Sequence, residues 1–293
     1  MNVGKKIRSL RTAKLMTQSE LAGTHITRNM LSYIENGAAQ PSLSTLVYLA
    51  GRLNVPVGFL LAEEGDEILY EKMNGLTNVK QAFRQGDFAG CRALCRASFA
   101  EPDDEIRLLL AECDVEIAVG QFWQGQLRSS CEMFDEALQY ASKTVYRIPQ
   151  VAATAEVYFG FMERISPTLY SENLDLSDSV DPLPDTPFCA YVRALDALDG
   201  GNLQPAKEYG EKFAESSFFG RHLRIRTDMA EGNYSPAKDA LLVLLRAEEP
   251  LNEVELYLVL CDLETCCRET EDYKGAYQYS NEKVQLLEQL LRE

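Results

Sequence analysis

Apolar residues in the first sixty positions recur at helical spacing and are interrupted by residue types that cap helices. Val3, Ile7 and Leu10 lie at i, i+4 and i+7, which places them on one face of a first predicted helix. Thr17 and Glu20 form a capping-box pattern, in which each side chain satisfies the other residue's amide, and this begins a second helix. The pattern predicts short helices that each bury one side.

The third predicted helix begins after Thr27, because a threonine side chain accepts a hydrogen bond from a free amide at a helix N-terminus. Its apolar face contains Leu31 and Ile34. Asn36-Gly37 ends it, as asparagine and glycine commonly do after a last helical turn.

Two further helices are predicted to begin at Pro41-Ser42 and at Pro56. We expect their inward faces to carry the following apolar residues: Leu43, Leu46, Val47, Ala50 and Leu53 on the fourth helix, and Phe59 and Leu60 on the fifth.

From about Gly65 onward, longer amphipathic helical patterns alternate with short polar turns. We expect five to six helix pairs across 66–292. In one of these pairs a helix over 105–119 is followed by a second helix over 126–144. One turn recurs. In it glycine, asparagine or aspartate is followed by an apolar residue and then by an alanine. Its four copies are Gln85-Gly86-Asp87-Phe88-Ala89, Gly201-Asn202-Leu203-Gln204-Pro205-Ala206, Gly232-Asn233-Tyr234-Ser235-Pro236-Ala237 and Glu271-Asp272-Tyr273-Lys274-Gly275-Ala276.

The spacing of these turns predicts a repeat architecture. Ala206 and Ala237 are 31 residues apart, and Ala237 and Ala276 are 39 apart. This period and turn resemble the tetratricopeptide repeat, in which helix pairs stack and bury each other's apolar faces. In such a turn the small alanine lets the second helix approach closely.

An acidic, proline-containing stretch over 170–187 interrupts the repeats. It carries Pro182, Pro184 and Pro187, five acidic residues and no lysine or arginine. It is predicted to be a flexible loop, either a linker between two lobes or a lid over a binding groove.

These patterns together predict an all-α chain of two domains. A five-helix domain over 1–62 is followed by a tetratricopeptide-like α-solenoid over 66–292.

Charge is segregated between the two predicted domains. The net charge of the chain is −16, yet residues 1–62 carry seven basic and two acidic residues, a net +5, which leaves −21 on the remainder. A basic head on an acidic body is the distribution expected when only the head contacts a polyanion such as DNA.

Other sequence features argue against several function classes. The eight cysteines include no Cys-x-x-Cys pair and the chain has two histidines, so we expect no metal site, no disulfide framework and no cofactor. We find no catalytic constellation and predict that the protein is not an enzyme. No apolar run spans a bilayer and no signal segment precedes the first helix, so a cytoplasmic location without membrane contact is expected.

The first domain resembles the Cro/repressor (XRE) family of helix-turn-helix proteins. Its matching residues are Ile7-Arg8-x-Leu10-Arg11, Thr17-Gln18-x-Glu20-Leu21-Ala22, Leu31-Ser32-Tyr33-Ile34-Glu35-Asn36-Gly37, Pro41-Ser42 and the stretch from Leu46 to Leu53. The turn between Ala22 and Thr27 is one residue shorter than is usual in that family. The resemblance implies a Cro/C1-type fold, with its third helix in the major groove of double-stranded DNA.

Residues on the outer face of that helix are the candidates for reading bases. An arginine can pair bidentately with guanine and an asparagine with adenine. We expect base contacts from four residues: Thr27, Arg28, Asn29 and Tyr33. Met30 either contacts a thymine methyl or packs in the domain. We expect phosphate contacts from four more: Arg11, Lys14, Gln18 and Gln40.

A repressor-type head with a tetratricopeptide-like body resembles the peptide-responsive regulators of the RNPP/Rgg group. This resemblance implies a homodimeric transcriptional regulator whose repeat domain binds a peptide or other effector. The alternative is that the repeat domain is a protein-binding scaffold or only a dimerisation module.

Candidate effector-binding residues in the body are a basic cluster and two asparagines: Arg221, Arg224, Arg226, Asn74 and Asn78. The arginines either hold a carboxylate of the effector or pair with neighbouring acidic residues. Phe122, Trp123 and Tyr158 are either core residues or groups that stack on a ligand.

Overall fold

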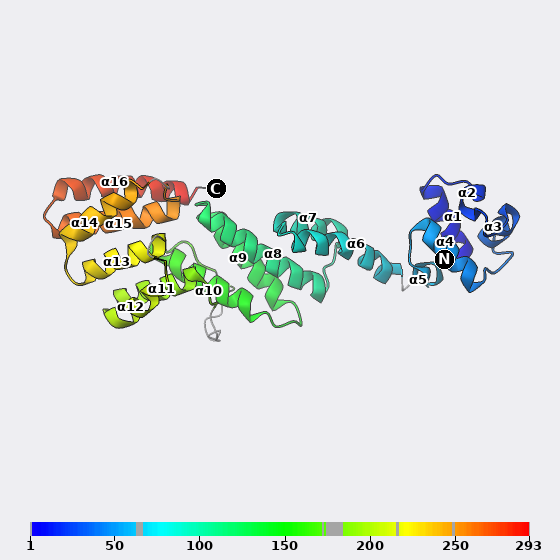
Figure 1. The fold of residues 1–293 in the computed structure, drawn as a ribbon, viewed down its shortest axis with the longest axis horizontal. Coiled ribbons are helices and arrows are strands. Elements are labelled where there is room, and N and C mark those ends of the chain that lie inside the picture. Colours follow the sequence, from blue (N-terminus) through cyan, green and yellow to red (C-terminus); the bar gives the residue numbers. More distant parts are fainter. Residues whose placement is uncertain are drawn as a thin grey trace. The chain divides into compact units, whose positions relative to one another are not determined.

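The computed structural model describes residues 2–62, 67–171, 173, 184–214, 217–247 and 250–292, without the side chains of 67–71 and 74. By their contacts the residues form two compact units, Met1–Gln81 and Ala82–Glu293, and each is described by itself. The predicted acidic loop over 170–187 lies largely outside the described residues. Every element described is a helix, as the hydrophobic pattern predicts (Figure 1).

The described residues 2–62 of unit 1 form a bundle of five short helices (Figure 1). They are α1 (Val3–Ala13), α2 (Gln18–Ala22), α3 (Arg28–Glu35), α4 (Leu43–Leu53) and α5 (Val57–Leu61). Their shared core contains Ile7, Leu21, Ala22, Leu31, Ile34, Leu46, Leu49, Ala50, Leu53 and Leu60.

The predicted caps begin the helices of unit 1. Thr17 and Glu20 make both hydrogen bonds of a capping box at α2, and the Thr27 hydroxyl accepts from the amide of Met30 at α3. Ser42 caps α4 in the same way. These three predictions are confirmed, because a cap depends only on residues within one helical turn.

The predicted buried face of α4 is wrong at two positions. Leu43 is 68% exposed and Val47 is 53% exposed, whereas Leu49 is fully buried. Leu46, Leu49 and Leu53 lie at i, i+3 and i+7, which defines a face rotated away from Leu43 and Val47. The helix carries two overlapping apolar stripes, and packing against α2 and α5 buries one of them.

A buried lysine joins the first helix of unit 1 to the fifth. Lys6 of α1 is 1% exposed, and its Nζ donates to the carbonyl oxygens of Phe59 at 3.2 Å and Ala62 at 2.5 Å. The ammonium also lies over the Phe59 ring, 5.4 Å from its centroid. It therefore donates hydrogen bonds to two carbonyls of the short helix α5 and its C-terminal cap.

Helix α6 (Glu67–Arg84) crosses from unit 1 to unit 2, and ten more helices follow it. They are α7 (Phe88–Ser98), α8 (Asp104–Trp123), α9 (Leu127–Ser142), α10 (Pro149–Ile165), α11 (Pro187–Asp199), α12 (Leu203–Gly210), α13 (Phe218–Ala230), α14 (Tyr234–Leu245), α15 (Glu253–Glu269) and α16 (Tyr273–Leu290).

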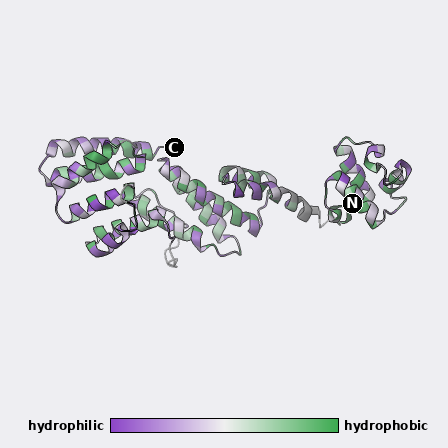
Figure 2. Ribbon diagram, viewed as in Figure 1, coloured by the Kyte–Doolittle hydropathy of each residue, from purple (hydrophilic) through white to green (hydrophobic). Residues whose placement is uncertain are grey.

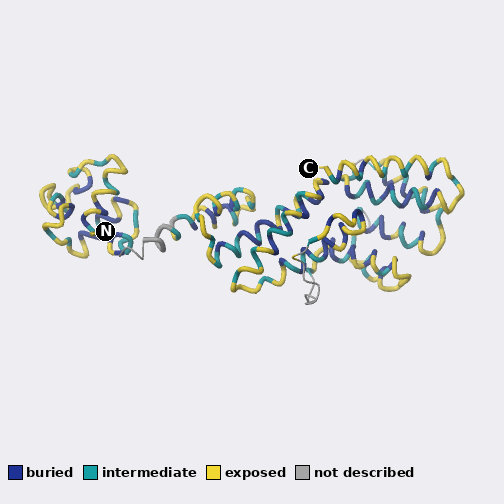
Figure 3. Tube along the Cα trace, turned by 180° about the vertical axis from the view of Figure 1, so that it is seen from behind, coloured by how far each residue is buried: buried dark blue, intermediate teal, exposed yellow. Residues whose placement is uncertain are grey.

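The helices of unit 2 pack mainly as neighbours in pairs. In the described part of this unit the pairs are α8/α9, α11/α12, α13/α14 and α15/α16, while α7 packs on α8 and α10 on α9. Helices α8 and α9 confirm the pair predicted over 105–119 and 126–144. In Figure 2 hydrophobic residues lie on the sides that face neighbouring helices, and in Figure 3 the same sides are the buried ones.

The recurring turn behaves as predicted in three of its four copies. Ala206, Ala237 and Ala276 are 3%, 0% and 8% exposed, each four residues after the residue that caps the second helix. In the first copy Ala89 is exposed, and Cys91 occupies the buried position instead. The prediction for Ala89 is therefore wrong, because the close approach depends on distance from the cap, which is Asp87.

Candidate nucleic-acid interface and ligand groove

Helix α3 presents two different faces. Leu31 and Ile34 lie in the core of unit 1, at 0% and 2% exposure. Arg28, Asn29 and Tyr33 are exposed on the other side, with Tyr33 at 59%. The four predicted base-reading positions are therefore accessible, although the Thr27 hydroxyl also accepts the capping hydrogen bond from Met30 at 3.1 Å.

A buried carboxylate fixes α3 to the two helices before it. Glu35, 3% exposed at the end of α3, accepts from both Nε and Nη2 of Arg11, at 2.6 and 3.0 Å. The side-chain amide of Gln18 donates to the same carboxylate at 2.8 Å. Arg11 also donates to the carbonyl oxygen of Met16 at 2.8 Å. One glutamate thus joins α1, α2 and α3.

The charges in this cluster stabilise each other. Burial acts to raise the pKa of Glu35, but hydrogen bonds from Arg11 and Gln18 and the positive charges of Arg11 and Arg8 outweigh it and leave that pKa below its ordinary value. The hydrogen bond to Glu35 raises the pKa of Arg11. Both groups are therefore charged in the folded domain at neutral pH.

Unit 2 contains a groove lined by residues of α6, α7, α8, α10, α11, α13 and α15. Two adjoining pockets, of about 600 and about 480 Å³, share the side chains of Val115, Glu116 and Thr154. The walls are largely apolar and aromatic. They include Phe83, Phe88, Val119, Trp123, Ile148, Val151, Val157, Tyr158, Phe188 and Phe219.

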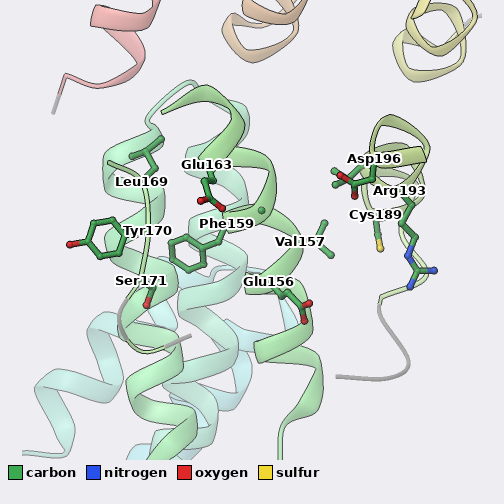
Figure 4. Close-up of a pocket in the computed structure, with 12 residues that line it drawn as sticks. Glu156, Val157, Phe159, Glu163, Leu169, Tyr170, Ser171, Cys189, Arg193 and Asp196 are labelled. Carbon is green, nitrogen blue, oxygen red and sulfur yellow. The ribbon is translucent and has the colours of Figure 1, made fainter. Parts of the chain in front are cut away.

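A second cavity of about 440 Å³ lies beside α10 and α11. Figure 4 shows Leu169 and Tyr170 on one side of α10, and Cys189, Arg193 and Asp196 of α11 on the other. Glu156 and Glu163 also line this cavity, so it is acidic with one arginine.

Next to the groove, a buried polar network connects α11, α13 and α15. The Tyr191 hydroxyl and His222 Nδ1 are 2.8 Å apart, and His222 Nε2 lies 3.0 Å from Asp262 Oδ2. Arg226 donates to the other oxygen of Asp262 at 2.8 Å and to Asp199 at 2.6 Å. Burial strongly raises the pKa of Tyr191, so its hydroxyl stays protonated.

The comparisons with known proteins bear first on unit 1. Residues 7–60 match the family model described as Helix-turn-helix. Residues 7–60 form a helix-turn-helix domain. An immunity repressor protein of Bacillus phage phi105 is 38% identical over 65 residues, which are 22% of this chain and 45% of that protein. The chain thus aligns with less than half of that relative.

Several solved structures are similar over nearly the whole chain at low scores. PlcR of Bacillus thuringiensis, in complex with the peptide PapR7 and DNA, is 14% identical with a TM-score of 0.24, and 100% of this chain and 99% of PlcR are covered. A mutant of PrgX is 11% identical, with a TM-score of 0.28 and coverage of 95% and 100%. ComR from S. thermophilus, with DNA and its signalling peptide ComS, is 17% identical, with a TM-score of 0.27 and coverage of 97% and 99%.

The predicted phosphate contacts of the helix-turn-helix domain lie in two environments. Lys14 and Gln40 are exposed. The polar groups of Arg11 and Gln18 are instead directed to Glu35, which the sequence analysis did not single out. The sequence signal that could have identified Glu35 is its position next to Ile34, on the buried side of an amphipathic helix.

The predicted effector residues do not gather in the groove. Arg226 pairs with Asp262 and Asp199, which is the alternative of pairing with neighbouring acidic residues. Arg224 is exposed and engaged with another group, while the buried Nε of Arg221 has no hydrogen-bond partner in the described part of the chain. Asn78 is exposed and lines neither pocket, and the Asn74 side chain lies outside the described residues.

The cysteines and the central aromatic residues of unit 2 are mostly buried. All eight cysteines are free and seven are buried, as expected for small hydrophobic residues. Phe122 and Tyr158 belong to the core, whereas Trp123 is partly buried and lines the groove. Among the described residues no group of three His, Cys, Asp or Glu side chains is arranged to hold a metal ion. No described helix is long and apolar enough to cross a membrane.

Proposed function

We propose that this chain is a sequence-specific DNA-binding transcriptional regulator. The observation that supports it most directly is the pair of opposed faces of α3, one buried and fixed through Glu35, the other exposing Arg28, Asn29 and Tyr33. A rigid helix with polar residues at its exposed N-terminal end fits the major groove of B-DNA. The net charge of +5 on residues 1–62 favours a polyanion.

Within this proposal the residues have separate roles. Arg28 and Asn29 contact base edges, together with Thr27 and Tyr33, while Lys14 and Gln40 contact phosphates. Arg11 and Gln18 were also predicted to contact phosphates. Their hydrogen bonds to Glu35 support a different role, in which they hold α3 at a fixed angle to the other helices.

Selection of bound duplexes from a random DNA library with the full chain tests this proposal. A single enriched motif is the expected result. Arg28→Ala should then cost about 1–3 kcal/mol and relax the preference at one base pair. Lys14→Ala is the matched control, since loss of a phosphate contact weakens all sequences alike and reduces the salt dependence. Binding without any sequence preference would contradict the proposal.

We also propose that the regulator acts as a homodimer. One helix-turn-helix contacts only a few base pairs, and two heads reading half-sites about 34 Å apart bind far more tightly. Gel-shift titration of a palindromic duplex against a single half-site, with the mass of the free protein from sedimentation, measures this. Equal affinity for both duplexes would reject a dimeric reader.

The repeat unit is proposed to sense a peptide or another effector through its groove. The groove supports this because it is a joined pair of pockets with apolar walls and few polar groups, which is the usual composition of a ligand site. The alternative is a scaffold or dimerisation module without a ligand. Trp123, the chain's one tryptophan, lines the groove, so its fluorescence reports occupancy directly.

A further inference from the structure

Two carboxylates lie on the groove flank of α8. Glu112 and Glu116 are four residues apart, which places them on one side of the helix. Glu112 lines one of the two pockets and Glu116 lines both. In the described part of the chain neither side chain forms a hydrogen bond or an ion pair, and the electrostatic interaction between the two is repulsive.

The environment of Glu112 disfavours its negative charge. Like charges at this spacing weaken a helix. Burial and the charge of Glu116 together raise the pKa of Glu112. No lysine, arginine or histidine is among the residues that line either pocket. The repulsion between these carboxylates is thus not relieved by any described side chain of the groove.

The opposite wall offers neutral hydrogen-bonding groups. Gln150 and Thr154 of α10 are also four residues apart and face the groove, and Asn252 lies at its far end beside Glu255. Amide and hydroxyl groups can both donate to and accept from a peptide backbone. Burial raises the pKa of Glu255, the third carboxylate of the groove.

The aromatic walls complete the chemistry. Phe83 and Phe88 line the pocket that contains Glu112, and Trp123 and Phe219 line the pocket that contains Glu255. Aromatic faces attract cations as well as apolar side chains. Two joined pockets of about 600 and 480 Å³ also exceed what a single small cation fills.

We propose that the groove binds a short extended peptide that carries a lysine or arginine between apolar or aromatic residues. Glu112 and Glu116 accept the cationic group, and Gln150 and Thr154 hydrogen-bond to the peptide backbone. This inference rests on the proposed sensing role and adds the charge and polarity of the ligand, through complementarity to a groove lined by carboxylates and aromatic rings.

A mixture of random heptapeptides, acetylated and amidated so that only side chains carry charge, is the probe. The full chain is immobilised, and the retained peptides are identified by mass spectrometry. The variant is Glu112→Gln/Glu116→Gln. The control is Glu101→Gln/Glu269→Gln, which removes the same charge from two exposed residues outside both pockets. Glu116→Gln alone is a third variant, because its exposed side chain can change without affecting packing.

The expected result is enrichment of lysine and arginine on the wild type and the control. The groove variant loses this enrichment, by about tenfold for a lysine peptide against its norleucine analogue, while apolar and aromatic preference persists. Retention of neutral peptides without enrichment of lysine or arginine, or a cation preference that survives in the groove variants, overturns the inference and leaves the sensing role standing. Retention no greater than on bare support overturns the inference and the proposed peptide sensing together.

Discussion

The cluster of Arg11, Gln18 and Glu35 allows one sharp prediction about the helix-turn-helix domain. Arg11→Met keeps much of the side-chain length but leaves Glu35 charged, with only the amide of Gln18 as a partner. The Glu35 side chain is buried, at 2% exposure, and the Arg11 side chain that covers it is 12% exposed, so water has little access to the pair. Breaking one partner of such a pair costs about 3–5 kcal/mol.

The comparison variants separate the interaction from simple loss of packing. Glu35→Met leaves Arg11 unpaired and should be destabilised to a similar degree. The double variant Arg11→Met/Glu35→Met buries two apolar side chains instead and should be less destabilised than the sum of the single variants by about 2 kcal/mol or more. Gln18→Ala removes one hydrogen bond to a charged group and should cost about 1.5–3 kcal/mol.

Hydrogen exchange of the full chain in a urea series measures these effects. Peptides from residues 3–61 report the unfolding of the helix-turn-helix domain, and peptides from unit 2 are an internal control that should not change. A cost below about 1 kcal/mol for Arg11→Met, or strict additivity in the double variant, would refute the reasoning that Glu35 holds the three helices together.

Three further predictions concern stability. Lys6→Met leaves the Phe59 and Ala62 carbonyls without their donor and should cost about 1–3 kcal/mol, read from faster exchange in peptides from α5. Burial raises the pKa of Asp114 to about 6 from an ordinary 3.8, with hydrogen bonding to Arg92 opposing it. The charge of Asp114 therefore opposes folding, and the urea midpoint of unit 2 should fall as pH rises from about 4 to about 6, a slope that Asp114→Asn should flatten. Glu271 has φ 60° in a turn where the other repeats have glycine. Glu271→Gly should therefore raise the free energy of unfolding by up to about 1 kcal/mol. An unchanged or lower thermal midpoint of this variant would contradict the prediction.

The sequence predicted the helices of both units well because their signals are local. The caps at Thr17, Thr27 and Ser42, and the glycine and alanine positions of the repeated turns, depend on neighbours within one or two turns of helix. The buried face of α4 was not predictable in the same way. Two apolar stripes on that helix satisfy the same periodicity, and only the packing partners decide which one is buried.

The candidate site was harder to predict because its partners are distant in sequence. Arg11 and Glu35 are separated by 24 residues, and a sequence pattern does not reveal that a basic residue on the first helix faces an acidic one on the third. The groove carboxylates were not predicted from the sequence for a different reason. Glu112 and Glu116 resemble the many solvated glutamates of an acidic chain, and only the pocket geometry separates them from the rest.

The two faces of α3 have a consequence for how such a protein changes over time. Residues that anchor the helix, Leu31, Ile34 and Glu35, are different from those it exposes at Arg28, Asn29 and Tyr33. All of these exposed residues can therefore be substituted with little change in the free energy of folding. Grafting a new outer face onto this scaffold should redirect the protein to a new operator.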